Sequence, residues 1–383
     1  MSRPIVLAAG GTGGHVFPAQ ALATELATRG LRLALVTDRR GGRHRAGFDD
    51  IEIHEVRSGT PRRQGLDQRL ASVAATALGT LEAAILLRRL RPAAVVGFGG
   101  YPSLPTMIAA TRLRVPCLVH EQNAVLGRAN RFVARRVAVI ATSFPHTARI
   151  EAAAHARIVQ TGNPVRQAFL ALADQPYEPP AETGPVTLFA MGGSQGAQSF
   201  STVLPDALAG LPGSLRARLR VVQQCRAEDL ESARARYADA QIDATLAEFF
   251  NDVAGELGRA HLVIARAGAS SVAEITVAGR PALLVPYPFS ADDHQTANAR
   301  AIADASAGWL IEQNEFEAAP LRERIATLLA GPETLAATAA AVRRFARPDA
   351  ARDLANLIED AMTDGHRLRS GAPGASPASE NAA

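Results

Sequence analysis

The stretch that decides the fold runs from residue 261 to residue 300 and reads HLVIARAGASSVAEITVAGRPALLVPYPFSADDHQTANAR. It holds an apolar run at 261–265, a helical pattern at 269–278, a second apolar run at 281–285 and another helical pattern from 292 to 305. Short apolar runs of about four to eight residues are typical of strands that helices cover on both faces. The stretch therefore predicts strand, helix, strand and helix in a parallel α/β sheet.

Polar side chains gather where these two strands end. Ligands of open α/β sheets lie at the carboxyl ends of the strands. A helix that begins there presents free N–H groups and the positive end of its dipole to an anionic ligand. The stretch therefore predicts half of a nucleotide site, formed by Arg266, Ser270, Ser271, Glu274 and Gln295.

Length and composition indicate a soluble protein of two domains. A chain of 383 residues, 47% hydrophobic and 20% charged, is long enough for two α/β domains. No run reaches the roughly 18 apolar residues of a spanning helix, and no signal-peptide pattern opens the chain, so we expect neither a membrane span nor export. Two isolated cysteines, Cys117 and Cys225, exclude a disulfide framework and a paired-cysteine metal site.

All 41 basic residues are arginine, because the sequence contains no lysine. A P-loop needs a lysine after its glycine loop, and a pyridoxal enzyme needs one for its Schiff base. The composition therefore excludes P-loop nucleotide kinases and pyridoxal-dependent enzymes.

The chain opens with a predicted strand at 4–9, a glycine-rich turn at 10–15 and a predicted helix at 17–28. The glycines allow backbone N–H groups to approach an oxygen-rich ligand at a helix N-terminus. A dinucleotide fingerprint would require glycine where Val16 stands, so the dehydrogenase interpretation fails. His15 is well placed to act as a general base, or it simply closes the turn as a polar residue.

A helical pattern at 66–90 carries an apolar face bracketed by arginines. Residues 57–136 contain thirteen arginines and three carboxylates, a charge balance of +10 in a chain whose net charge is +4. The segment is either a core helix with a solvated rim or an apolar patch that docks on anionic lipid. Aromatic residues make up only 5% of the chain, which disfavours nucleic acid, and we prefer the membrane surface. The patch comprises Leu66, Leu70, Val73, Ala77, Leu81, Arg69, Arg88 and Arg89.

Two further predicted strands end in polar residues. The strand at 115–120 leads into Glu121 and Asn123, and the strand at 157–161 leads into a turn that contains Arg166. Beside a histidine, Glu121 is either a hydrogen-bonding partner or an acid/base catalyst. Because the carboxyl ends of parallel strands share one edge of a sheet, we expect these groups to lie in the same site.

The plan of the sequence repeats after a proline-rich segment at 174–185. Residues 185–197 repeat the plan of residues 4–15, with an apolar strand, paired glycines, a hydroxyl and a helix start. This predicts two nucleotide-fold halves. We place the first domain at 1–163, a linker at 164–184, the second domain at 185–340, a C-terminal helix at 341–363 and a disordered tail at 364–383.

Six separated motifs together resemble the MurG family of bacterial N-acetylglucosaminyltransferases. They are GGTGGHxxPA at 10–19, HEQNAVxGxANR at 120–131, TGNPVR at 161–166, GGSQGA at 192–197, RAGASSVAE at 266–274 and DDHQTANA at 292–299. The resemblance implies a GT-B glycosyltransferase fold, in which two Rossmann-like domains face each other across a cleft. Leu126 stands where many relatives carry proline, and we expect this to affect only the stiffness of the loop.

The activity that the resemblance implies is transfer of GlcNAc from UDP-GlcNAc to the C4 hydroxyl of MurNAc in lipid I, undecaprenyl-pyrophosphoryl-MurNAc-pentapeptide. The product would be lipid II, for peptidoglycan synthesis, cell shape and cell division. The implied location is the cytoplasmic face of the inner membrane, peripherally bound. The implied partners are UDP-GlcNAc, lipid I, an anionic membrane surface and other cell-wall synthesis proteins, but no nucleic acid. Alternatives are a GT-B transferase with another glycolipid acceptor, a UDP-GlcNAc epimerase and a non-enzymatic protein that binds the membrane surface.

The resemblance also implies roles for single residues. Ser194 would hold phosphate, Phe250 would lie near the uracil, Glu274 would accept the ribose hydroxyls and Gln295 would bind the sugar. Arg266 and the turn formed by Ala269, Ser270, Ser271, Val272 and Ala273 would flank the base and the pyrophosphate. The first domain would close the cleft with Thr12, Gly13, Gly14, Asn123 and Arg166.

Inverting transfer needs a base for the acceptor hydroxyl and stabilisation of the departing UDP. His15 is our first choice for the base, and Glu121 is the alternative or the residue that orients His15. No pair of carboxylates with metal-binding spacing ends a strand, because Asp292 and Asp293 are adjacent. We therefore expect helix N-termini and Arg166 to stabilise the leaving group, without a cofactor or an obligatory metal.

Overall fold

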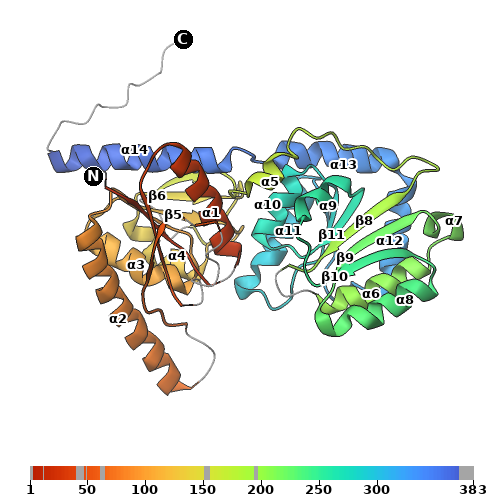
Figure 1. Ribbon diagram of the computed structural model, residues 1–383, viewed down its shortest axis with the longest axis horizontal. Helices are drawn as coiled ribbons and strands as arrows, with labels where there is room; N and C mark the ends of the chain where they lie inside the picture. The colour runs from red at the N-terminus through yellow and green to blue at the C-terminus, as the bar shows by residue number, and fades with distance from the viewer. Residues whose placement is uncertain are drawn as a thin grey trace, which may run out of the picture.

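The protein folds into two α/β domains, each built on one parallel sheet (Figure 1). The computed structural model describes residues 3–11, 13–39, 47–48, 50–60, 65–150, 156–193 and 197–370. For Leu66 and residues 364–370 it describes only the backbone. The prediction of two nucleotide-fold halves is confirmed.

The first sheet has seven strands in the order β3-β2-β1-β4-β5-β6-β7. Every neighbouring pair is parallel, and β1 lies between β2 and β4. The strands are β1 (Ile5–Ala8), β2 (Leu33–Thr37), β3 (Glu52–Glu55), β4 (Ala94–Gly97), β5 (Cys117–Glu121), β6 (Val139–Thr142) and β7 (Arg157–Gln160). The helices are α1 (Gly13–Thr28), α2 (Leu66–Leu90), α3 (Gly100–Arg112), α4 (Arg128–Val133) and the 3-10 turn η2 (Ala134–Arg136).

Helices cover both faces of this sheet, which explains why its central strand β1 is apolar on every residue. Ile5 and Leu7 of β1 pack toward α1, whereas Val6 and Ala8 pack toward α2 and α3. Alternate residues of a strand point to opposite faces, so each face needs its own apolar set. The first sheet is therefore a central layer between two layers of helices.

The second sheet repeats the plan with the order β10-β9-β8-β11-β12-β13. Its first strand, β8, again lies between the second and the fourth strand of its domain. The strands are β8 (Val186–Met191), β9 (Leu219–Gln224), β10 (Asp243–Ala247), β11 (Leu262–Ala265), β12 (Ala282–Leu284) and β13 (Trp309–Leu310). The helices are α6 (Gln198–Ala209), α7 (Gly213–Arg216), η4 (Ala227–Asp229), α8 (Leu230–Asp239), α9 (Val253–Arg259), α10 (Ala269–Val277), η5 (Ala291–Asp293), α11 (His294–Asp304), α12 (Ala318–Ala330) and α13 (Pro332–Phe345).

The segment between the domains is packed at its start. Residues 164–184 contain the short helix α5 (Gln167–Leu170), and the side chains of Val165 and Phe169 are buried in the core of the second domain. The first part of the predicted linker therefore belongs structurally to the second domain.

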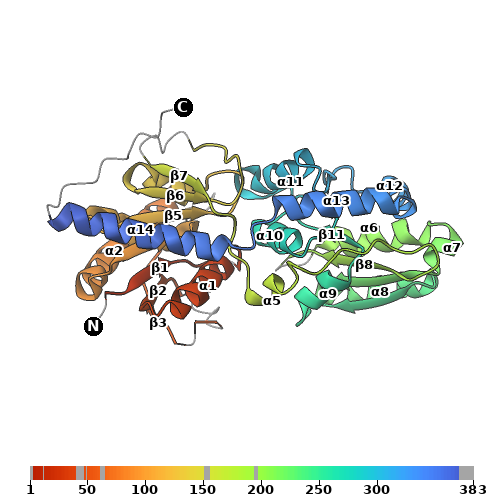
Figure 2. The same cartoon turned by 90° about the horizontal axis from the view of Figure 1, so that it is seen from above.

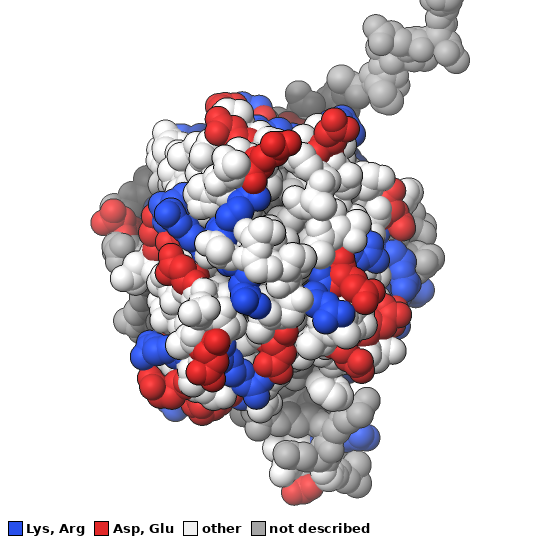
Figure 3. Space-filling model, turned by 90° about the vertical axis from the view of Figure 1, so that its right-hand side faces the viewer, with Lys and Arg blue, Asp and Glu red and all other residues white. Residues whose placement is uncertain are grey.

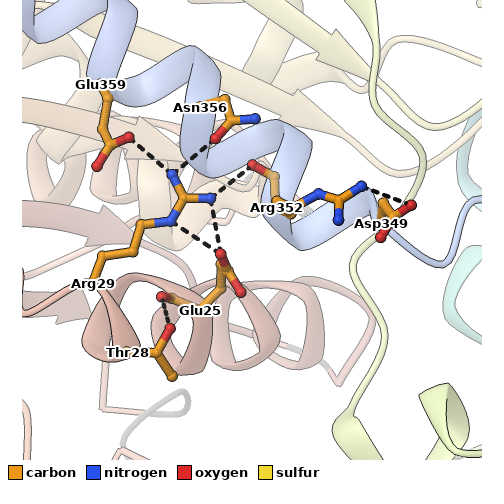
Figure 4. Close-up of polar contacts among 7 residues, drawn as sticks. All are labelled: Glu25, Thr28, Arg29, Asp349, Arg352, Asn356 and Glu359. Atoms are coloured by element: carbon orange, nitrogen blue, oxygen red, sulfur yellow. Dashed lines mark hydrogen bonds and ion pairs between the residues drawn. The ribbon is translucent and has the colours of Figure 1, made fainter.

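The chain returns to the first domain through its last helix, α14 (Ala350–Ser370), which Figure 2 shows along the side of that domain. Leu354 and Ile358 are buried in the core that also holds β1 and α1. Arg29 at the end of α1 donates to Glu359 at 2.8 Å and to Asn356 at 2.9 Å (Figure 4). Buried apolar side chains and an ion pair therefore fasten α14 to α1.

The C-terminal part of the chain differs from the prediction in two places. The helix expected at 341–363 is two helices, because α13 ends at Phe345 and α14 begins only at Ala350. The tail expected to be disordered from 364 continues α14 to Ser370, since the leucine and arginines there favour helix and the single Gly365 does not end it. Residues 371–383 lie outside the described part of the chain.

Candidate active site

The carboxyl ends of the two sheets meet at a seam of polar side chains. Asn298 of α11 is fully buried there. Its Oδ1 accepts the N–H of Ala124 at 2.8 Å, and its Nδ2 donates to Asn123 Oδ1 at 3.1 Å and to Ala267 O at 2.9 Å. One amide therefore joins the loop after β5 in the first domain to the loop after β11 in the second.

A partly buried ion pair crosses the same seam. Arg166, which follows β7, donates to Oε1 of Glu274 on α10 at 2.9 Å, and its guanidinium lies over the rings of Phe17 and Phe169. Burial raises the pKa of Glu274 above its ordinary value, and Arg166 partly offsets that shift. The predicted ribose acceptor is thus an enclosed carboxylate with one cationic partner.

Three arginines of the first domain hold Asp292 of the second. Arg128 and Arg131 on α4 and Arg149 approach its carboxylate at 2.8 to 3.1 Å. The hydrogen bond from Arg128, followed by the other arginines, lowers the pKa of Asp292 to about 2. We call this group the Asp292 clasp.

His15 lies in the first turn of α1, which begins at Gly13 and not at the predicted Phe17. The sequence did not predict this turn, because glycine is a poor helix former. The N–H groups of a first turn have no acceptor within the helix in any case. Nδ1 of His15 lies 3.0 Å from Oε1 of Gln122, which follows β5. Gly100 lies between them after β4, where a Cβ atom would come within 3.0 Å of the His15 ring.

Glu121 is buried with both carboxylate oxygens in use. Oε1 accepts the backbone and side-chain N–H groups of Asn123, and Oε2 accepts from Gly127 N and Asn130 Nδ2, each at 2.8 to 3.2 Å. The carboxylate therefore organises the loop of residues 122–130. The partner of the His15 ring is the neighbouring Gln122, although the sequence suggested Glu121 for that task.

The predicted donor turn lies at the N-terminus of α10. Gly268 occupies the N-cap position and provides no side-chain cap, and Ser270 Oγ is buried without a hydrogen-bond partner among the described residues. The first N–H groups of this helix and the hydroxyl of Ser270 are therefore free to bind an anion. Ala269, Ser271, Val272 and Ala273 form the same turn and the one that follows it.

The guanidinium of Arg266 is buried and already bonded. NH1 donates to the carbonyls of Val285 and Pro286 at 3.1 Å, and NH2 donates to Ser199 Oγ at 3.0 Å. Burial lowers the pKa of Arg266 from its ordinary value. Its bonds tie the end of β12 to the start of α6, so it supports the walls of the site.

Gln295 and Phe250 complete the predicted donor set. Gln295 Oε1 accepts the N–H of Tyr287 at 2.9 Å, which leaves its amide NH2 as the end that can donate to a sugar. Phe250 is half-buried, with its ring centroid 6.0 Å from that of Phe189. Gly13 is buried and Gly14 exposed at the start of α1, whereas Thr12 and Ser194 lie outside the described residues.

A small pocket, partly open to solvent, lies beside α10 at the seam. Its lining includes Ala269, Val272 and Ala273 together with Asn163, whose amide nitrogen and oxygen are buried without a partner among the described residues. His15 and Gln122 do not line it.

Sequence reasoning missed three residues of the seam: Gln122, Asp292 as a clasp, and Asn298. Each belongs to a motif quoted above, HEQNAVxGxANR or DDHQTANA, and motif membership was the available signal. In the described part of the chain no three His, Cys, Asp or Glu side chains converge as metal ligands.

The predicted membrane patch lies on α2, whose bounds match the prediction. Leu70, Val73 and Leu81 are 62%, 67% and 58% exposed, while Ala83 and Leu87 are buried against the domain. The lower end of α2 projects from the domain in Figure 1, so the core-helix interpretation is wrong for its first turns. Ala77, Arg69, Arg88 and Arg89 are exposed too, and the side chain of Leu66 is outside the described part.

Length and composition would allow one described helix to cross a membrane. It is the segment 67–90 of α2, with a mean hydropathy of 1.8 and 17% of its most apolar window buried. The pair of Ala318–Ala330 with Pro332–Thr363 meets the same criteria only across a bend of 91°. Length and composition alone do not make α2 a span, and the helix packs one side on α3.

Comparison with known proteins gives matches over nearly the whole chain. Residues 5–142 match the glycosyltransferase family 28 N-terminal domain, and residues 187–354 match the C-terminal domain of that family. A relative in Rhodospirillum centenum is 54% identical over 93% of both chains and is named UDP-N-acetylglucosamine–N-acetylmuramyl-(pentapeptide) pyrophosphoryl-undecaprenol N-acetylglucosamine transferase.

Solved structures share the fold. MurG from Acinetobacter baumannii is 32% identical, with a TM-score of 0.76 over 94% of this chain and 100% of that one. A UDP-GlcNAc 2-epimerase from Neisseria meningitidis has a TM-score of 0.67 over 94% of this chain and 100% of that one, but only 12% identity. The second likeness concerns the fold alone.

Proposed function

The chain belongs to glycosyltransferase family 28, among its bacterial N-acetylglucosaminyltransferases, and we infer that it transfers N-acetylglucosamine from UDP-GlcNAc to lipid I, giving lipid II. The observation that carries this function is the identity of 54% with a transferase of that name over 93% of both chains. The geometry agrees, because the polar strand ends of both sheets meet at one seam.

The test is transfer of radiolabelled GlcNAc from UDP-GlcNAc to a short-chain analogue of lipid I, with UDP-GlcNAc alone as the control. We expect incorporation that depends on the lipid. Conversion of the donor without an acceptor would instead indicate an epimerase or a hydrolase, and UDP binding without turnover would indicate another acceptor.

For the chemical step, we propose that His15 removes the proton of the acceptor hydroxyl. The hydroxyl oxygen then attacks the anomeric carbon of GlcNAc, the bond from that carbon to the phosphate oxygen breaks, and UDP leaves with inversion. Gln122 fixes one ring nitrogen of His15, so the other is available as the base. The four hydrogen bonds of Glu121 favour His15 over this carboxylate as the base.

For the donor, we propose that the N-terminus of α10 and Arg166 stabilise the charge that develops on UDP. Free N–H groups of a helix stabilise phosphate, and Ser270 adds a hydroxyl there. Glu274 would share its oxygens between Arg166 and the ribose hydroxyls. Phe250 and Gln295 would contact the uracil and the sugar, and Ser194 would hold phosphate. Thr12, Gly13, Gly14 and Asn123 would close the cleft from the first domain.

We also propose that turnover needs no obligatory metal. The proposed groups supply the positive charge that a metal would otherwise provide to the leaving phosphate. Turnover in the lipid-dependent assay should persist after dialysis against excess chelator. Loss of turnover that added Mg²⁺ or Mn²⁺ restores would overturn this part.

Finally, we propose that the face of α2 docks on an anionic membrane as a peripheral anchor at the cytoplasmic side. Exposed leucine and valine bordered by arginine fit lipid tails and anionic headgroups. The end of the second domain differs, because Figure 3 shows arginines and carboxylates interspersed over that face. An anchor on the first domain would hold the seam close to a lipid-borne acceptor and to other wall-building proteins.

A further inference from the structure

Four groups at the seam form a continuous line of hydrogen bonds behind His15. Nδ1 of His15 meets Oε1 of Gln122 at 3.0 Å, and Nε2 of Gln122 meets Nδ1 of His120 at 3.0 Å. Nε2 of His120 lies 2.9 Å from the backbone carbonyl of Gly162. The line therefore runs from the start of α1 through the end of β5 to the turn after β7.

Two backbone carbonyls fix the direction of every bond in this line. Gly162 O can only accept, so His120 must carry its proton on Nε2 and present a lone pair on Nδ1. The carbonyl of His120 also can only accept, and Nε2 of Gln122 lies 3.0 Å from it. If the amide of Gln122 were flipped, its Oε1 would lie against two acceptors, the carbonyl oxygen of His120 and the lone pair on Nδ1 of His120. Oε1 must therefore face His15.

His15 must then donate from Nδ1, because Oε1 of Gln122 is an acceptor. The hydrogen bond at one imidazole nitrogen decides which nitrogen carries the proton. Nε2 of His15 is thereby left with its lone pair, and it makes no hydrogen bond to another described residue.

We propose that Gln122 and His120 are positioning residues that hold His15 in the Nδ1–H tautomer, so that its Nε2 is the base of the transfer reaction. The catalytic part of this proposal rests on the proposed function of His15. When Nε2 takes the proton of the acceptor hydroxyl, the imidazolium still donates from Nδ1 to Gln122, and no other proton has to move. Gln122 and His120 stay as they were.

Burial keeps the direction of these hydrogen bonds unchanged. His120 and Gln122 are at most 1% exposed, and burial lowers the pKa of His120 to about 4, so this ring stays neutral at physiological pH. A protonated His120 would donate from Nδ1, so the amide of Gln122 would have to turn its Oε1 toward His120 and its NH2 group toward His15. Burial of His120 therefore protects the tautomer of His15.

The direct test is the tautomer of His15 by nitrogen NMR on the full chain labelled with ¹⁵N-histidine. The protein has nine histidines, and the His15→Ala variant identifies the His15 resonances by their loss. We expect protonated Nδ1 and unprotonated Nε2 in the wild type. In Gln122→Met, which keeps the length of the side chain but removes its amide, the Nε2–H tautomer should appear.

Kinetics then test whether the tautomer matters. Gln122→Met should lower kcat by about tenfold or more while the KM for UDP-GlcNAc stays within about twofold, since only the base is affected. His120→Phe should have a smaller effect, because the carbonyl of residue 120 still orients the amide. Ser143→Ala is the matched control: it removes a buried hydrogen bond to Glu121 O at the same strand end without touching the line, and should retain kcat.

Two results would overturn the proposal. One is Nε2–H as the main tautomer of His15 in the wild type, and the other is an unchanged tautomer in Gln122→Met. The assignment of His15 as the base is tested separately. Normal turnover of His15→Ala would refute that assignment and the catalytic use of the tautomer, whatever the NMR spectrum of the wild type shows.

Discussion

His15 and Glu121 illustrate at the residue scale how two neighbouring polar groups take different tasks. His15 is half-buried, with one ring nitrogen bound to Gln122 and the other without a bond to any described residue. Glu121 is buried and accepts four N–H groups of its own loop. A group whose bonds are all satisfied by the fold supports structure, whereas a group with a free lone pair at the seam is available for chemistry.

This contrast predicts different consequences for two substitutions. His15→Ala should lower kcat by about 10²- to 10⁴-fold and leave the free energy of unfolding nearly unchanged. Glu121→Ala should lower the free energy of unfolding by about 3 kcal/mol or more, because it leaves buried N–H donors without an acceptor. Denaturant unfolding and steady-state kinetics on both variants check this. If Glu121→Ala were stable but lowered kcat by about 10³-fold, while His15→Ala stayed fully active, the two roles would have to be exchanged.

His120 makes the stability of the fold depend on pH. Its pKa falls from 6.5 to about 4 on folding because of burial, so between these values the unfolded chain binds more protons than the folded protein. The free energy of unfolding should therefore decrease as the pH falls from 6.5 toward 4, by at most about 1.4 kcal/mol per pH unit from this residue. His54 and His261 have lowered pKa values too and add to the slope.

The contribution of His120 is measured by denaturant unfolding of the wild type and His120→Phe at pH 7, 6 and 5. The phenylalanine variant should show a shallower decline, because it has no ring to keep neutral. If the free energy of unfolding declined equally with pH in the two proteins, the assignment of this slope to His120 would be contradicted.

At the element scale, α2 joins the core along one side and leaves an apolar face uncovered. Thr80, Ala83 and Leu87 are buried, while the exposed large apolar side chains lie on its other side. Monomeric proteins rarely expose so many large apolar groups together unless the surface has a partner. The exposed set is Leu70, Val73, Leu78, Leu81 and Ile85, of which Leu78 and Ile85 were not part of the predicted patch.

The patch predicts the behaviour of a paired substitution. Leu70→Glu with Leu81→Glu should abolish sedimentation with vesicles that contain anionic lipid, because the carboxylates replace exposed apolar area and repel the headgroups. The thermal midpoint should remain within a few degrees, since both side chains are exposed. Leu70→Ser with Leu81→Ser serves as the uncharged control and should weaken binding less. Unchanged sedimentation of the glutamate pair would refute the anchor.

At the scale of the whole molecule, the two domains are joined by few but specific contacts. Asn298 is buried at the seam and the Arg166–Glu274 pair is partly buried there. The Asp292 clasp lies at the edge of the seam, and α14 holds the far side. Asp292 adopts a positive φ of 55°, a conformation that asparagine tolerates well. Its charge can therefore be removed without changing the backbone.

Asp292→Asn should loosen the arrangement of the domains. An ion-pair network of this kind is worth about 1 to 2 kcal/mol, so the KM for UDP-GlcNAc should rise by about five- to thirtyfold while the folding of each domain persists. Small-angle scattering without substrate should show a larger radius of gyration. Asp293→Asn is the matched control, because Asp293 also has a positive φ, but its carboxylate accepts from Thr296 of the second domain and from no described residue of the first. Equal effects in both variants would rule out the clasp.

The low pKa of Asp292 sets the pH range of this contact. A carboxylate whose pKa falls from 3.8 to about 2 on folding contributes stability that is complete above pH 3.8 and is lost as the pH falls through 2. The clasp therefore stays closed throughout the physiological range.

The sequence by itself determined the elements and the chemistry available to them. Continuous apolar runs predicted β1, β5, β11 and β12, and helical spacing predicted the bounds of α2. The repeat of residues 4–15 at 185–197 predicted two sheets of one plan. These features depend on neighbours along the chain, and local periodicity records them. The motifs likewise showed which polar groups lie at strand ends.

Only the tertiary structure decided which of those polar groups meet. His15 follows β1 and Gln122 follows β5, 107 residues later. They touch because β4 alone separates their strands, and Gly99 and Gly100 at the start of α3, which follows β4, have no side chains in the way. The sequence named Glu121 as the orienter, but the pleat of β5 turns that carboxylate into its own loop and leaves the amide beside it to face His15. The Asp292 clasp and the seam at Asn298 depend in the same way on how two separate sheets are set against each other, which no local pattern encodes.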